Sequence, residues 1–225
     1  MSLLLLGNSM NAPRLSADAR REQILDVAIQ VFGRAGYYGA SMNDIADAAG
    51  VTKPVLYQHF DSKSDLYAAL LDEVGTRMLQ SITKETADAV DGREQTVRGF
   101  RAYFRWVAQR HDEFMLLFGG SARHAEEFAG QIRGITDEAA AAIAPLIAVD
   151  IDPEHRDTLA HALVGLAEGA SRRLVGLGEN FDPDEIAREV SALAWAGLRA
   201  VQRPARPAAA VAYRSDWRCR SFVVR

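Results

Sequence analysis

Apolar residues recur every three or four positions along most of this chain, which is the spacing of an amphipathic helix. The first such run follows Ser16, and its apolar face consists of Ile24, Val27, Ala28, Val31 and Phe32. Gly36 is expected to end this helix, because glycine tolerates the backbone turn that follows a helix. No segment alternates convincingly between apolar and polar residues, so the pattern predicts no strand.

Two short helices with a tight turn between them are predicted in SMNDIADAAGVTKPVLYQHF, residues 41–60. Ser41 and Asp44 have the spacing of a capping box at the start of the first helix. Gly50 is expected to end that helix in a turn that glycine makes without strain. Thr52 should cap the second helix, with Pro54 in its first turn, where no amide hydrogen is needed.

Six further helices are predicted downstream, separated by glycine, proline and Asp-Pro breaks. Their expected ranges are 61–90, 96–110, 113–120, 121–148, 154–178 and 181–202. Pro145 is expected to kink or end the fourth of them. The chain is therefore predicted to be all-α, with about nine helices and no internal repeat.

Composition places the chain among globular proteins of one or two domains. It has 225 residues, of which 48% are hydrophobic, and no apolar run approaches the roughly 20 residues that cross a membrane. The single cysteine, Cys219, excludes an intramolecular disulfide and fits a reducing compartment. The start, MSLLLLGNSM, is too short and too uncharged for a signal peptide. We expect a cytoplasmic protein, with Met10 as a plausible start and residues 1–15 as a disordered extension.

Charge argues against a broad nucleic-acid-binding surface. The net charge is −4, and residues 1–202 carry 20 bases against 29 acids, whereas residues 14–63 carry six of each. Any DNA contact must therefore be local and geometric. Residues 203–225 carry six arginines and one acid without a helical period. They are predicted to be a disordered basic tail; the alternative is an arm that touches DNA phosphates.

The two short helices have the plan of a helix-turn-helix, in which the first helix braces the second and the second enters a major groove. The residues expected to face inward are Ile45, Ala46, Ala49, Val51, Leu56 and Phe60. Those left along the exposed side are Lys53, Pro54, Val55, Tyr57, Gln58 and His59. Lysine supplies a charged donor, tyrosine and histidine suit phosphates, and valine and proline suit thymine methyls.

The segment from about Arg20 to Leu71 resembles the DNA-binding region of the tetracycline-repressor (TetR) type of bacterial regulators. The resemblance rests on F-x-x-x-G-Y, then S-x-x-D-I-A-x-x-A-G-V, then L-Y-x-H-F-x-x-K-x-x-L. It implies an all-helical homodimer, with a three-helix DNA-binding domain at 16–62. Residues 63–202 would then form a helical bundle for ligand binding and dimerisation.

The resemblance also implies roles for individual residues. Phosphate contacts are implied for Ser41, Asn43, Thr52, Tyr57, His59 and Lys63, and base contacts for Lys53, Pro54, Val55 and Gln58. Plainer alternatives stand beside four of these roles. Tyr57 would be a core aromatic, and His59 a histidine whose hydrogen bonds are made within the protein. Lys53 would be a solvated charge, and Gln58 would make no contact with DNA.

Aromatic and aliphatic residues between Phe100 and Phe118 exceed what one helix face needs. We expect an apolar ligand cavity lined by Phe100, Tyr103, Phe104, Val107, Phe114 and Phe118. The alternative is that these residues form an ordinary bundle core. The candidates for the polar ends of the cavity are Arg105, Trp106, His111, Arg123 and His124. KPVLYQHF looks like the recognition helix of some actinobacterial regulators of lipid metabolism, which hints at a fatty-acyl ligand.

The last two predicted helices are rich in small residues, which let helices approach closely. The expected homodimer interface consists of Leu163, Leu166, Ala170, Leu193, Trp195, Gly197 and Leu198. Packing within one chain is the alternative. Two-fold pairing would place two recognition helices about 34–36 Å apart, one turn of DNA, and predicts a pseudo-palindromic operator.

Catalytic signatures are absent from the sequence, which has no G-x-S-x-G, H-E-x-x-H, paired C-x-x-C, phosphate loop or dinucleotide fingerprint. We therefore expect no enzyme activity, no metal and no cofactor. The predicted function is a repressor that a small apolar effector releases from operator DNA. The alternatives are an activator, a chromosome-organising protein on the same fold, and a helical sensor that binds no DNA.

Overall fold

The computed structural model describes residues 15–119, 126–147, 150–176 and 181–201. Nine α-helices and no strands lie within these ranges, which confirms the predicted all-α class and helix number. The predictions for residues 1–14 and 203–225, and for Arg123 and His124, fall outside the described residues.

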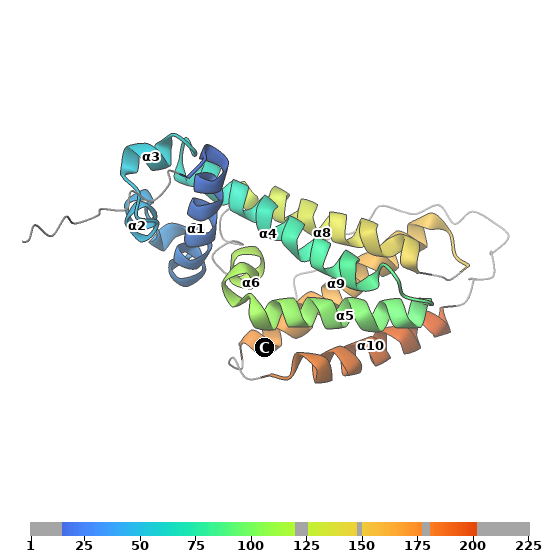
Figure 1. The fold of residues 1–225 in the computed structure, drawn as a ribbon. Coiled ribbons are helices and arrows are strands. Elements are labelled where there is room, and N and C mark those ends of the chain that lie inside the picture. Colours follow the sequence, from blue (N-terminus) through green and yellow to red (C-terminus); the bar gives the residue numbers. More distant parts are fainter. Residues whose placement is uncertain (1–14, 120–125, 148–149, 177–180, 202–225) are drawn as a thin grey trace, which may run out of the picture.

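Three helices form a head at one end of the elongated molecule (Figure 1). They are α1 (Ala17–Gly39), α2 (Met42–Ala48) and α3 (Lys53–Tyr57). The long helix α4 (Lys63–Thr86) runs from this head into the rest of the molecule. The remaining elements form the body: α5 (Gly92–Gln109), α6 (His111–Phe118), the 3-10 turn η1 (Glu126–Phe128), α8 (Ala129–Ile143), the 3-10 turn η2 (Ala144–Leu146), α9 (Pro153–Val175) and α10 (Pro183–Ala200).

The predicted capping box opens α2. The Ser41 Oγ accepts the Asp44 amide at 3.2 Å, and the Asp44 carboxylate accepts the Ser41 amide at 2.9 Å. Gly50 has a φ of 64°, so a residue with a side chain would be strained in the turn that follows. Both predictions are confirmed.

Thr52 precedes α3 as predicted, but its side chain makes no capping hydrogen bond. The prediction of a side-chain cap was wrong. Pro54, the second residue of α3, removes one of the two amides that such a cap can bind, and the Thr52 hydroxyl makes no hydrogen bond with the other, that of Val55.

Gly36 interrupts α1 without ending it. Its φ of 69° breaks the helical path, and one further turn follows before the Ala40 amide donates to the Gly36 carbonyl at 3.2 Å. This turn directs Tyr37 into the interior, where its ring centroid lies 4.9 Å from that of Tyr67 and 5.0 Å from that of Phe128.

The starts of α5 and α8 differ most from their predicted positions. α5 begins at Gly92 rather than residue 96, because the Asp91 carboxylate accepts the Glu94 amide at 2.8 Å and caps the helix. The described part of the predicted helix 121–148 begins with the 3-10 turn η1, and the Phe128 ring at the end of that turn packs against the rings of Tyr37 and Tyr67. Its other end follows the prediction, because η2 replaces the α-helix at Pro145.

α4 connects the head to the body through a continuous core. Leu66, Leu70, Leu71 and Val74 on this helix are fully buried, and α4 packs against α1, α5, α6 and α8. A displacement of α4 within the body would therefore also shift the head.

No helix within the described ranges is long and apolar enough to span a membrane.

Candidate DNA interface and cavity

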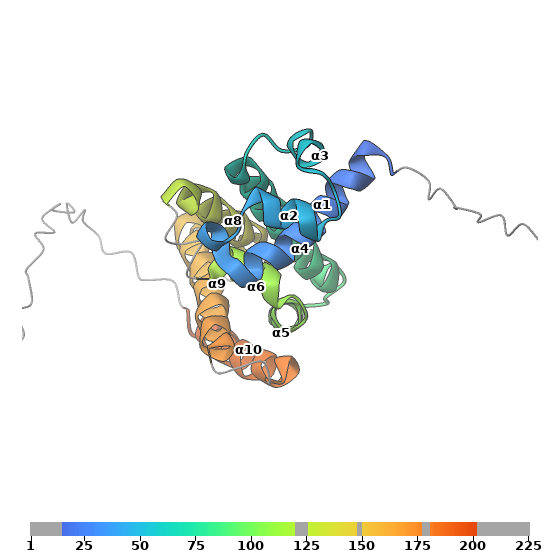
Figure 2. The same ribbon diagram turned by 90° about the vertical axis from the view of Figure 1, so that its left-hand side faces the viewer.

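The head separates inward and outward residues as the sequence predicts. Ile45, Ala46, Ala49, Leu56 and Phe60 are buried, and Val51 is half-buried against the core. On α3 and the turn that follows it, Lys53, Pro54, Tyr57 and Gln58 are exposed, whereas Val55 and His59 are half-buried. Figure 2 looks onto this end of the molecule, where α2 and α3 lie.

Tyr57 is 42% exposed, so it is not a core aromatic. The ammonium of Lys53 lies 5.9 Å from the centre of the Tyr57 ring. The two side chains thus present a cation and a phenol on one side of α3. Ser41, Asn43 and Thr52 are also exposed, which leaves the Thr52 hydroxyl, unused as a cap, open to solvent.

Lys63 is more enclosed than a phosphate-binding lysine needs to be. Its Nζ donates to the carbonyls of Tyr37 at 2.9 Å and Ala40 at 3.1 Å, and lies 4.5 Å from the centre of the Tyr37 ring. It therefore fastens the α1–α2 connection to the start of α4. Its phosphate contact stays a prediction, and only one ammonium hydrogen remains for it.

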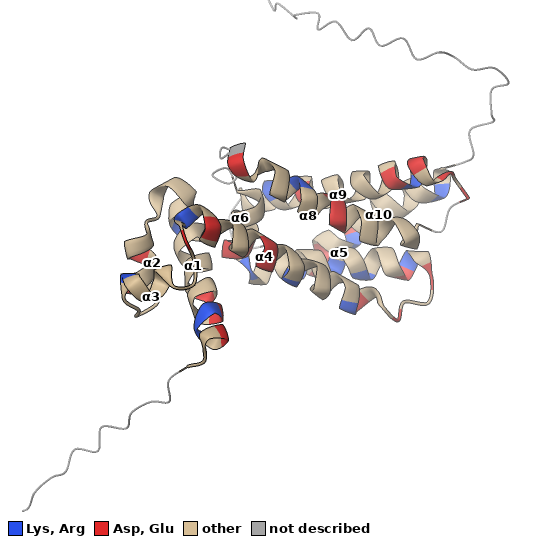
Figure 3. Cartoon of the chain, turned by 90° about the horizontal axis from the view of Figure 1, so that it is seen from above, with Lys and Arg blue, Asp and Glu red and all other residues tan. Residues whose placement is uncertain are grey.

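The Asp44 carboxylate on the head is held close to its own backbone. Hydrogen bonds from the Ser41 hydroxyl and amide hold the pKa of the Asp44 carboxyl below its ordinary value. Figure 3 shows both cationic and anionic residues on the head, in agreement with its neutral sequence. Recognition would thus depend on the few groups along α3 rather than on a broad field.

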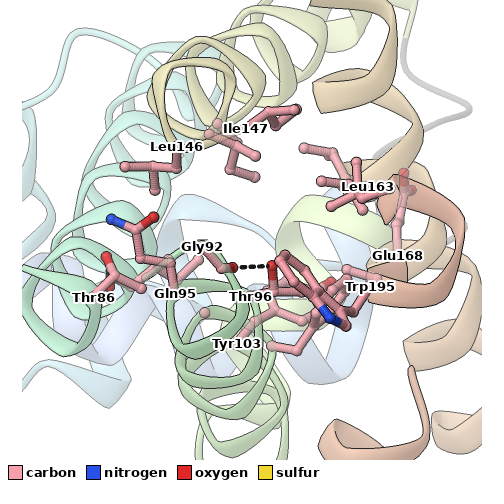
Figure 4. A pocket seen from close by; sticks show the side chains of 18 of the residues that line it. Thr86, Gly92, Gln95, Thr96, Tyr103, Leu146, Ile147, Leu163, Glu168 and Trp195 are labelled. Atoms are coloured by element: carbon pink, nitrogen blue, oxygen red, sulfur yellow. Dashed lines mark hydrogen bonds between the residues drawn. The ribbon is translucent and has the colours of Figure 1, made fainter. Parts of the chain in front are cut away.

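The body contains a cavity of about 430 Å³. It is bounded by α4, α5, α6, α8, η2, α9 and α10, and Figure 4 shows part of its lining. Its lining is mostly apolar, with Met78, Ile82, Phe100, Phe118, Ile143, Leu146, Ile147, Leu163, Val164 and Trp195 among its residues. This volume lies within the roughly 300–1,000 Å³ of small-molecule sites.

Three of the six predicted lining residues, Phe100, Tyr103 and Phe118, face this cavity. Phe104, Val107 and Phe114 are almost wholly buried in the core and do not line it. For the two residues on α5, the reason is their position along the helix axis. The cavity follows α5 from its start as far as Tyr103, and Phe104 and Val107 lie beyond that point.

The polar ends proposed for the cavity lie elsewhere. Arg105 pairs with Asp184 through two hydrogen bonds of 2.9 and 2.8 Å at the start of α10. The Trp106 indole donates to Glu113 at 3.2 Å. His111 lines a separate polar groove where α1 meets α6. Burial raises the pKa of the Tyr103 phenol, so this lining residue stays protonated.

Several lining residues were missed although the sequence carried a signal for them. Met78, Ile82 and Thr86 recur every four residues on α4 and form one wall. Leu163, Trp195 and Leu198, predicted for a dimer interface, also line the cavity. Of the other residues predicted for that interface, Leu193 and Gly197 are exposed, and Leu166 and Ala170 are half-buried. Among the described residues, no group of three or more His, Cys, Asp or Glu is placed to hold a metal ion.

Comparison with known families covers both parts of the chain. Residues 24–70 match the family of bacterial regulatory proteins named tetR. Residues 93–197 match the tetracyclin repressor-like C-terminal domain.

Two characterised relatives are transcriptional regulators. The HTH-type transcriptional activator FasR of Mycolicibacterium smegmatis is 30% identical over 194 residues, which are 85% of this chain and 89% of FasR. The HTH-type transcriptional repressor NicS of Pseudomonas putida is 28% identical over 134 residues, 58% of this chain and 63% of NicS.

Solved structures share the fold. A TetR-like transcriptional regulator from Rhodococcus sp. RHA1 has a TM-score of 0.69 at 30% identity, covering 84% of this chain and 100% of that one. The regulator FadR from Bacillus subtilis, solved with stearoyl-CoA, has a TM-score of 0.70 at 18% identity, covering 78% of this chain and 98% of FadR. With both domains matched and the relative FasR aligned over most of its length, the chain belongs to the TetR family of bacterial transcriptional regulators.

Proposed function

We propose that this regulator is a repressor, released from a pseudo-palindromic operator when a small apolar effector enters the cavity of the body. One observation carries the proposal: the same helix, α4, forms a wall of the cavity with Met78, Ile82 and Thr86 and begins at the head with Lys63. An effector that moves α4 would change the position of the head.

The proposed DNA-binding unit is residues 16–62, with α3 in the major groove. Lys53, Pro54, Val55 and Gln58 would face bases. Ser41, Asn43, Thr52, Tyr57, His59 and Lys63 would hold phosphates. The exposure of Tyr57, Gln58 and Lys53 supports this orientation.

The proposed effector carries a fatty-acyl chain. The apolar lining supports a ligand of this kind, and the related fold of FadR was solved with stearoyl-CoA. Release requires that the effector bind the DNA-free conformation more tightly. Each 1.4 kcal/mol of that preference weakens DNA binding about tenfold.

Residues 63–202 would also form the homodimer, through α9 and α10. Leu193 supports this arrangement, because it is an apolar side chain left 64% exposed on α10. In such a dimer two copies of α3 would meet successive turns of DNA.

The test is fluorescence anisotropy with a duplex from the upstream region of the gene and a shuffled duplex, at about 150 mM salt. We expect a preference of about a hundredfold or more for the upstream duplex, lost in Tyr57→Ala. Equal, weak binding to both duplexes would contradict an operator beside the gene. Genome-wide occupancy would then distinguish a distant operator from the many sites of a chromosome-organising protein.

An activator is the second candidate, and the relation to FasR favours it. The DNA contacts would be the same, with the opposite effect on transcription. A promoter–reporter fusion in a strain that lacks the gene decides between the two: a repressor gives a higher signal without the gene, and an activator gives a lower one.

A further inference from the structure

The threonine hydroxyls on the cavity lining are already committed as donors. Thr96 donates to the Gly92 carbonyl at 2.7 Å, Thr136 to the Arg133 carbonyl at 2.7 Å, and Thr86 to the Ile82 carbonyl at 3.0 Å. Each hydroxyl has only one hydrogen. These residues therefore offer a ligand their methyl groups and oxygen lone pairs, but no donor.

The Tyr103 hydroxyl is kept from a ligand by burial. It makes no hydrogen bond among the described residues, but it is enclosed beside Ser171 of α9 and has no exposed surface of its own. A ligand oxygen in this cavity would thus find neither threonine nor tyrosine hydrogens.

Gln95 differs from these residues. It lies in the second turn of α5, is half-buried, and lines the cavity. Its carboxamide makes no hydrogen bond with any other residue in the described part of the chain, so both of its N–H groups are uncommitted. Figure 4 shows the carboxamide extending from α5 on the side of the cavity that Leu146 lines.

The charged groups on the lining offer no enclosed cation to an anionic ligand end. They are Asp150, Glu168 and Arg199. Arg199 is exposed in the last turn of α10, where solvent screens its charge. Glu168 is already paired with Arg172. A neutral ligand oxygen avoids the cost of enclosing an anion without a cation beside it.

We propose that Gln95 is the specificity-determining residue of the cavity and donates a hydrogen bond to the carbonyl oxygen of a neutral acyl group, an ester or a thioester. The apolar chain of the ligand then lies against Met78, Phe100 and Phe118. An ester carbonyl accepts but does not donate, so it matches a lining on which Gln95 holds the free amide hydrogens. The inference rests on the proposed function, since it names the chemistry of the effector at the same site.

The experiment measures binding of three probes to the full-length protein at pH 7.5. The probes are methyl laurate, lauric acid and N-phenyl-1-naphthylamine, a neutral apolar dye without oxygen. The dye reports the cavity by its fluorescence, and the other two are measured by its displacement. The variants are Gln95→Leu, which removes the amide at similar size, and Gln95→Glu, which removes the N–H donors. Thr96→Val is the matched control, because its hydroxyl hydrogen is already committed to Gly92.

We expect the wild type to bind methyl laurate more tightly than lauric acid. Both Gln95 variants should bind the ester about threefold to tenfold more weakly, the range of one neutral hydrogen bond. Gln95→Leu should bind the dye as well as the wild type, which also shows that it has folded. Thr96→Val should change ester binding less than about twofold.

Three results would overturn the inference while leaving the apolar cavity intact. They are ester affinity unchanged in both Gln95 variants, lauric acid bound as tightly as the ester, and a loss of ester binding in Trp195→Phe, which removes the indole N–H from the same lining, instead of in Gln95→Leu. Failure of the dye to bind the wild type is a different outcome. It would overturn the proposed effector site, and this inference with it.

Discussion

At the scale of single residues, Tyr57 is the side chain whose placement tests the DNA interface most simply. It is exposed, so its phenol contributes little to folding. We expect Tyr57→Phe to lower operator affinity about threefold to tenfold through one lost phosphate hydrogen bond. The dependence of affinity on salt should not change, because no charge is removed.

The matched control for this substitution is Tyr38→Phe, which alters a head tyrosine that is 67% exposed and lies outside α2 and α3. Anisotropy titrations at several salt concentrations measure both quantities. Equal effects of the two substitutions would contradict a specific role for Tyr57.

Lys63 has a structural role that its sequence motif does not reveal. Lys63→Met would leave the carbonyls of Tyr37 and Ala40 without their donor. We expect it to lower the free energy of unfolding by about 1–3 kcal/mol, measured by urea denaturation. Unchanged stability would instead make Lys63 mainly a phosphate contact, provided that the slope of log affinity against log salt concentration also fell by about one.

At the scale of helices, α4 and α8 approach each other closely at Gly75. A Cβ added there would lie 3.0 Å from the side chain of Ile135, which is itself buried. We expect Gly75→Ala to destabilise the fold by about 1–3 kcal/mol through overpacking. Thermal unfolding measures this change.

Gly134 on α8 provides the comparison, because a Cβ added there meets nothing within 4 Å. Gly134→Ala should be neutral or stabilise the protein by up to about 1 kcal/mol, the difference in helix propensity. Two alanine substitutions with the same effect would show that the α4–α8 contact is not tight.

Helix ends were predictable where the cap is local in sequence. Ser41 with Asp44 is an example, since the capping residues are three positions apart. Thr52 precedes its helix as predicted but makes no side-chain cap, and the proline that marks the helix start leaves only the Val55 amide for one. The 3-10 turn that ends at Phe128 could not have been predicted, because the Phe128 ring packs against Tyr37 and Tyr67, which are distant in sequence.

At the scale of the whole molecule, the sequence predicted apolar faces but not their partners. Phe100 and Phe104 are four residues apart on α5, yet only Phe100 lines the cavity. Leu163 and Trp195 likewise face the cavity although their spacing also suited a dimer interface. Which neighbour an apolar face meets depends on long-range packing, which helical periodicity does not encode.

The exposed Leu193 tests the proposed homodimer. We expect Leu193→Glu to weaken self-association about tenfold or more. The substitution would place a charge where the proposed dimer buries an apolar side chain. Sedimentation analysis measures the change. Val90→Glu is the control, because Val90 is 87% exposed in the turn between α4 and α5. A monomeric wild type, or an unchanged Leu193→Glu dimer, would contradict an interface at α10.

The central claim is that cavity occupancy weakens DNA binding, and the most direct measurement is operator affinity by anisotropy with and without stearoyl-CoA. We expect stearoyl-CoA to weaken operator binding about tenfold or more, which corresponds to about 1.4 kcal/mol of coupling. The loss should be smaller in Ala139→Phe, which places a ring on the cavity wall. If calorimetry showed stearoyl-CoA bound to the protein while operator affinity stayed the same, the claim would be contradicted.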